Sequence, residues 1–127
     1  MHIVDGQQVC RPAAHDEALL DVDNAGAKVI NKSYGYAGTT YDSIAVLVDT
    51  VLYNNNKQMV FTISAGNDGD TTAITTPGTA KNDITVGAVR QYPDLFTLTT
   101  FSSKGPETNT RMGPTLCQVG QSGSSLP

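Results

Sequence analysis

Apolar and polar residues alternate along the chain in blocks that predict short strands separated by helices. Residues 28–33, 58–64 and 83–89 are short apolar runs rich in β-branched side chains, which is typical of strands. The run at 58–64 has few polar positions, so we expect it to be buried on both faces of a sheet. An apolar pair before Asp5-Gly6 predicts a short strand and turn, and residues 95–103 alternate enough to predict a further strand.

Two segments between these strands carry apolar residues at helical spacing. The first spans about 14–24 and ends at Asn24-Ala25-Gly26, a favourable helix stop. The second runs from Thr40, which we expect to cap it, to about Tyr53, with Asp42 in its first turn. The apolar stripes comprise Ala18, Leu19 and Val22 in the first helix, and Ile44, Leu47, Val48, Val51 and Leu52 in the second.

The order strand, helix, strand, loop, strand predicts an α/β fold with a largely parallel sheet, flanked by helices in three layers. We assign residues 1–106 to this α/β domain. Residues 107–127 are polar and rich in Gly, Ser and Pro, and they predict an irregular tail.

Composition excludes some function classes. The length of 127 residues fits one small domain. A net charge of −4 without a basic patch argues against nucleic-acid binding, and no apolar run reaches the length of a membrane span. No spacing of ligand-type residues indicates a metal or cofactor site. Whether Cys10 and Cys117 form a disulfide stays open. The N-terminus lacks the pattern of a secretion signal, and the cellular location stays open.

Small polar residues follow the apolar run at 58–64. They comprise Ser64, Ala65, Gly66, Asn67, Asp68 and Gly69. Ligands of open parallel sheets bind outside the carboxyl ends of the strands. Asn67, an amide side chain at such a strand end, is therefore the first candidate for function.

Five short segments form a further pattern. They read V-I-N-K-S-Y-G at 29–35, I-S-A-G-N-D-G at 63–69, T-P-G-T-A-K-N at 76–82, I-T-V-G-A-V at 84–89 and F-S-S-K-G-P at 101–106. In this order and spacing they resemble the motifs of the subtilisin-like serine proteases, the subtilases. A looser likeness to the next motif of that family extends over residues 111–122.

The resemblance implies a partial subtilisin-like fold and the family's activity, which is hydrolysis of peptide bonds in peptides or proteins by acyl transfer. It gives Asn67 the role of the oxyanion-hole amide, which donates to the negative oxygen formed during catalysis. It gives Ser33, Tyr34 and Gly35 the role of a strand that pairs with the substrate backbone. With Ala65 and Gly66, that strand forms the walls of the family's primary specificity pocket.

The three catalytic motifs of the family have no counterpart in this sequence. Val4-Asp5-Gly6 is only weakly similar to the Asp motif and lies in the wrong context. The residues around His2 and His15 do not match the His motif, and residues 120–124 do not match the Ser motif. We therefore expect the chain to be the central fragment of a subtilase without the Asp-His-Ser triad. We also expect it to be inactive as a peptidase by itself.

Other interpretations stay open. Asn67 is also a favourable turn residue, and Tyr34 also fits a plain packing role. A fragment of a larger sheet has unpaired edges. The edge at 33–35 would then pair with a second copy of the chain in a homo-oligomer, or with a peptide in a binding module. A weak serine esterase would need an improvised pair, such as His15 with one of the tail serines at 122–125.

Overall fold

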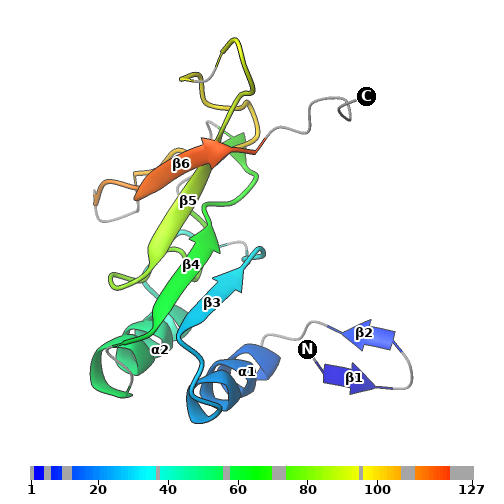
Figure 1. Cartoon of the computed structure of the whole chain (residues 1–127), viewed down its shortest axis with the longest axis vertical. Coiled ribbons are helices and arrows are strands. Elements are labelled where there is room, and N and C mark those ends of the chain that lie inside the picture. Colours follow the sequence, from blue (N-terminus) through cyan, green and yellow to red (C-terminus); the bar gives the residue numbers. More distant parts are fainter. Residues whose placement is uncertain are drawn as a thin grey trace.

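The computed structural model describes residues 2–4, 7–9, 13–36, 38–55, 58–69, 74–94, 96–106 and 111–120. The elements of the chain are β1 (His2–Val4), β2 (Gln7–Val9), α1 (Ala13–Asn24), β3 (Val29–Lys32), α2 (Ser43–Thr50), a π-helical turn η1 (Val51–Asn55), β4 (Val60–Ser64), β5 (Ile84–Val89) and β6 (Leu116–Val119) (Figure 1). The three apolar runs form β3, β4 and β5, and both predicted helices are present.

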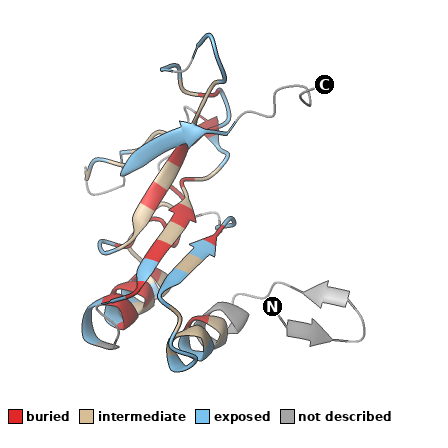
Figure 2. Ribbon diagram, in the orientation of Figure 1, coloured by how far each residue is buried: buried red, intermediate tan, exposed pale blue. Residues whose placement is uncertain are grey.

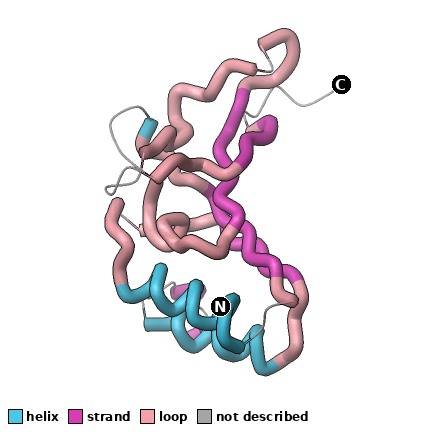
Figure 3. Tube along the Cα trace, turned by 90° about the vertical axis from the view of Figure 1, so that its left-hand side faces the viewer, coloured by secondary structure: helices cyan, strands magenta, loops and turns pink. Residues whose placement is uncertain are grey.

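Four strands form a wholly parallel sheet in the order β3-β4-β5-β6, whereas β1 and β2 pair as a separate antiparallel hairpin. The predicted α/β fold, a parallel sheet flanked by helices, is thereby confirmed. Both α1 and α2 lie on one side of the sheet (Figure 3), so the described residues form two of the three predicted layers. Because the strands are parallel, their carboxyl ends lie at one edge of the sheet.

The core lies between the helices and the sheet. Phe61 and Ile63 of β4 pack with Leu19 of α1 and Val48 of α2. Figure 2 shows buried residues gathered in α2, β4 and β5, whereas β6 is exposed along its length. On the other face of β4, Val60 is 41% exposed, because no described helix covers that face. The expectation that this strand is buried on both faces is therefore wrong within the described residues.

Helix α2 is capped by Asp42 and not by Thr40. The Asp42 Oδ1 accepts the backbone N–H groups two and three residues further on, both at 3.1 Å, as an N-cap residue does. The carbonyl of Thr40 instead accepts the hydroxyls of Thr76 at 3.2 Å and Thr79 at 3.1 Å. The predicted cap is wrong because Thr40 is bound by the loop that precedes β5.

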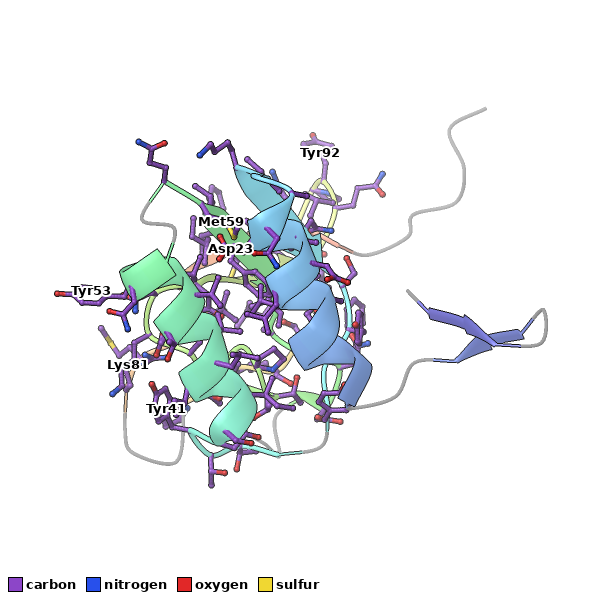
Figure 4. All side chains as sticks on the ribbon, turned by 90° about the horizontal axis from the view of Figure 1, so that it is seen from below. Asp23, Tyr41, Tyr53, Met59, Lys81 and Tyr92 are labelled. Carbon is purple, nitrogen blue, oxygen red and sulfur yellow. The ribbon has the colours of Figure 1, made fainter. Side chains whose placement is uncertain are left out.

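Asp49 ties α2 to the beginning of β5. Its buried carboxylate accepts the Tyr41 hydroxyl at 2.8 Å, the Lys81 N–H at 2.9 Å and the Asn82 N–H at 2.8 Å. The Lys81 Nζ lies 4.3 Å from the centre of the Tyr41 ring, and Figure 4 shows the two side chains beside α2. The hydrogen bond to Asp49, followed by burial and the charge of Asp49, raises the pKa of Tyr41 above its ordinary value. This network fixes the segment 76–82 against the helix.

Two predictions for the last third of the chain are wrong. The segment predicted as a strand at 95–103 is irregular where it is described, with one bridge between Leu98 and Val89. Its polar groups bind β5 instead: the backbone N–H of Thr99, for example, donates to the Ala88 carbonyl at 3.0 Å. The tail predicted as irregular contains β6, a run of only four residues within a stretch that is otherwise polar and rich in Gly, Ser and Pro. The boundary between domain and tail at 106 stays a prediction.

Candidate functional site

The candidate residues follow two neighbouring strands at the carboxyl edge of the sheet. Residues 33–35 follow β3 directly, and residues 65–67 follow β4. The strands are paired in parallel register, with Lys32 opposite Ile63. All six residues therefore extend from adjacent strand ends, which is where open parallel sheets bind ligands.

The backbone around Asn67 is hydrogen-bonded on both sides, whereas its side chain is exposed. The Ser103 N–H donates to the Gly66 carbonyl at 3.1 Å, and the Asp68 N–H donates to the Ser103 Oγ at 3.3 Å. Within the described part of the chain, the Asn67 carboxamide has no hydrogen-bond partner.

The interpretation of Asn67 as a plain turn residue stays open, although the Asn67 side chain does not form an Asx turn with the described residues. In an Asx turn the Asn side chain accepts the backbone N–H two residues further on. That N–H belongs to Gly69, and it donates to the Phe101 carbonyl at 2.9 Å. The turn is therefore held by the backbone of another segment.

Residues 33–35, which the family resemblance makes the other wall of the candidate site, are exposed. The Asn31 Nδ2 donates to the Ser33 Oγ at 3.1 Å. The Nζ of buried Lys32 lies 4.7 Å from the centre of the Tyr34 ring, a cation–π distance. Tyr34 also lines a pocket of about 140 Å³ between α1, α2 and β3. The Tyr34 ring thus contacts Lys32 while the residue is 43% exposed, and the choice between a packing role and a binding role stays open.

Thr75 and Thr76 connect the two walls. The Thr75 N–H donates to the Ala65 carbonyl at 3.1 Å, and the Thr76 carbonyl accepts the N–H of the residue after Gly35 at 2.8 Å. A Cβ on either Gly35 or Gly66 would lie 2.8 Å from the Thr75 Oγ1. One buried segment therefore contacts both candidate walls.

Sequence reasoning missed the roles of Thr75 and Ser103. Thr75 directly precedes the T-P-G turn, and Ser103 lies inside the F-S-S-K-G-P segment. Both segments were noted as motifs, but a motif does not say which backbone atoms its hydroxyls will meet.

Several sequence candidates lie outside the described residues or side chains. They are Cys10, the side chains of His2 and His15, and the tail serines, so the disulfide and the improvised esterase pair have no geometry to test them. Cys117 is exposed and has no disulfide partner among the described residues. In the described ranges no three His, Cys, Asp or Glu residues gather to hold a metal, and no helix is long and apolar enough to cross a membrane.

Comparison with known proteins agrees with the sequence motifs. The family profile "Peptidase_S8: Subtilase family" matches residues 2–126. A thermophilic serine proteinase of Bacillus sp. (strain AK1) is 34% identical over 87 residues, which are 68% of this chain and 20% of that protein.

Solved structures share the fold. The prenylagaramide maturation protease PagA matches with a TM-score of 0.61 at 22% identity, over 82% of this chain and 36% of that one. The PatG macrocyclase in complex with peptide matches with a TM-score of 0.60 at 16% identity, over 80% of this chain and 28% of that one. This chain thus spans 20% to 36% of the length of these proteins. Because the family profile covers nearly all of its residues, the chain belongs to the subtilase family.

Proposed function

We propose that this chain forms the oxyanion-binding and substrate-binding part of a subtilisin-like serine endopeptidase, and that in isolation it binds peptides without hydrolysing them. The observation that carries the proposal is the Asn67 carboxamide. It is exposed and has no partner among the described residues, while the backbone on both sides of it is hydrogen-bonded. Because the backbone on both sides is held, only the Asn67 side chain has to adjust when a negative oxygen forms beside it.

Each wall of the site has its own task. The Asn67 amide donates to the oxyanion, and one such donor lowers the reaction barrier by about 3 kcal/mol, a value established on a subtilisin itself. Residues 33–35 pair with the peptide backbone as an added strand, which uses hydrogen bonds that every peptide can make. Residues 65–66 form the opposite wall.

The missing step is nucleophilic attack. A serine hydroxyl attacks a peptide carbonyl only when a positioned base removes its proton. The Asp, His and Ser motifs that supply this chemistry in the family have no counterpart in the sequence of this chain. Binding without acyl transfer is the activity that the chain's own residues support.

Isothermal titration calorimetry with a phosphinic peptide tests the proposal, because the phosphinate is a stable anionic mimic of the tetrahedral intermediate. Asn67→Ala is expected to weaken binding about tenfold or more, since a hydrogen bond to a charged group contributes about 1.5–3 kcal/mol. Asn54→Ala is the matched control, because Asn54 is exposed in η1, which precedes β4. Equal affinity in both variants would contradict the proposal.

A second candidate function is self-association. The edge strand β3 begins at Val29, which is 68% exposed, and β6, the other edge, is exposed along its length. Unpaired edges beside exposed apolar residues favour pairing with another chain. We expect a homodimer or a larger assembly.

A further inference from the structure

Ser103 binds the backbone on both sides of Asn67. Its N–H donates to the Gly66 carbonyl at 3.1 Å, and its Oγ accepts the Asp68 N–H at 3.3 Å. We propose that Ser103 is a positioning residue that holds Asn67 ready for oxyanion binding. This inference rests on the proposed function and adds a residue that does not itself touch the ligand.

The Ser103 hydroxyl also lies against Gly66. Gly66 has a φ of 114°, and a Cβ built on it would lie 2.8 Å from the Ser103 Oγ. Only glycine adopts this backbone conformation readily and leaves room for the hydroxyl. The turn before Asn67 and the position of Ser103 are therefore matched to each other.

Ser103 is itself anchored to the sheet. Its residue surface is 0% exposed, and that of its neighbour Ser102 is 1% exposed. The Ser102 Oγ accepts the Ala88 N–H of β5 at 3.0 Å and donates to the Ser103 carbonyl at 3.4 Å. Ser103 thus lies in a buried segment packed against a central strand, which is among the least mobile parts of a fold, and of the two serines only Ser103 bonds to the backbone beside Asn67.

An oxyanion donor contributes through preorganisation, so its support matters as much as its chemistry. The Asn67 carboxamide is exposed and has no partner among the described residues, so no contact of its own side chain fixes it there. Its direction depends on the backbone from Gly66 to Asp68, which Ser103 holds at both ends. Because Ser103 is neutral, it fixes this segment without adding a charge that would compete for the ligand.

Two neighbouring substitutions separate positioning from simple stability. Ser103→Ala removes the hydroxyl that binds Asp68, whereas Ser102→Ala removes an equally buried hydroxyl that binds β5. Both are expected to lower stability to a similar extent. Only Ser103→Ala is expected to lower the NMR order parameters of the Asn67 and Asp68 amides, from about 0.85 to below about 0.6. It should also weaken phosphinic-peptide binding about fivefold, the effect of losing one hydrogen bond.

The inference is overturned if order and affinity are unchanged in Ser103→Ala, or if Ser102→Ala changes them equally. If the order parameters are unchanged in Ser103→Ala but peptide binding is weakened in Asn67→Ala, this inference fails and the proposed function stands. Unchanged binding in Asn67→Ala removes the proposed function instead.

If Ser103→Ala fails to fold, hydrogen exchange in the unsubstituted chain tests the inference independently. Asp68 is an exposed residue, yet its N–H donates to a buried hydroxyl. Its exchange is expected to be at least about tenfold slower than that of an unstructured amide. Exchange at the unstructured rate would overturn the inference without any variant.

Discussion

Gly35 and Gly66 lie against the same hydroxyl. A Cβ on either glycine would come to 2.8 Å from the Oγ1 of Thr75, which is a buried residue. The two glycines belong to two different candidate segments, at 33–35 and 65–67, and both come close to one residue. A side chain at either position would require Thr75 to shift.

Gly66→Ala is expected to destabilise the fold by about 2–5 kcal/mol. The substitution combines an unfavourable positive φ with overpacking against Ser103 and Thr75. Gly26→Ala is the control, because Gly26 has a φ of 74° but nothing within 4 Å of its Cβ position. It should lose only about 1–2 kcal/mol. Urea unfolding measures both, and equal losses would show that the site around Gly66 is not close-packed.

Because of the Tyr41 phenol, we expect the chain to lose stability at alkaline pH. Its hydrogen bond to Asp49 raises its pKa, so the folded chain keeps the phenol proton to a higher pH than the unfolded chain does. The contribution is complete below the ordinary tyrosine pKa of about 10 and is lost as pH rises through the folded value. Tyr41→Phe should lower stability by about 1 kcal/mol at pH 7 and reduce the alkaline loss.

Urea unfolding at pH 7 and at about pH 11 checks this linkage. Tyr92→Phe is the control, because Tyr92 is 79% exposed. If the alkaline loss in Tyr41→Phe matched that in Tyr92→Phe, the bond between Tyr41 and Asp49 would not be the cause.

Self-association predicts a mass above that of one chain in light scattering at micromolar concentration. Val29→Lys places a charge on the exposed edge strand β3 and should shift the assembly toward the monomer. Val46→Lys makes the same change on α2, at a residue that is 45% exposed, and should not. A monodisperse monomer for the unsubstituted chain would rule out the assembly.

The absence of triad motifs predicts that a fluorophosphonate will not label the chain stoichiometrically, whereas a complete subtilase labels to about one equivalent. Stoichiometric labelling would refute the proposal that this chain lacks a nucleophile. Any slow hydrolysis of p-nitrophenyl acetate should be compared with that of the double variant His2→Ala, His15→Ala. Activity that survives both substitutions excludes the improvised pair of a histidine and a tail serine.

Much of the fold could be predicted from periodicity. The runs that became β3, β4 and β5 are apolar and β-branched, and the stripe that became α2 repeats at helical spacing. Strand β6 was missed because its L-C-Q-V run has only four residues within a polar stretch, and its pairing comes from contact with β5. The alternating segment at 95–103 was wrongly predicted as a strand, since its hydroxyls bind the backbone of Ala88 in β5 and of Asp68 in place of a regular backbone ladder.

The candidate site was predicted in part. Motif resemblance singled out Asn67 and residues 33–35, and the parallel sheet brings their strands together. Thr75 and Ser103 could not be assigned, because their roles depend on bonds to residues 10 and 35 positions away in the sequence. Local pattern cannot predict such long-range pairings.

The most direct test of the account follows the Asn67 side-chain amide by ¹H–¹⁵N NMR during titration with the phosphinic peptide. At saturation, the account predicts a downfield shift of the Asn67 Nδ2 protons, as expected for donation to an anionic oxygen. The backbone amides of residues 33–35 should shift in the same titration. The corresponding amide peptide should shift residues 33–35 but leave the Asn67 side chain nearly unchanged. Asn67 resonances that do not move at saturation with the phosphinic peptide would contradict the central claim.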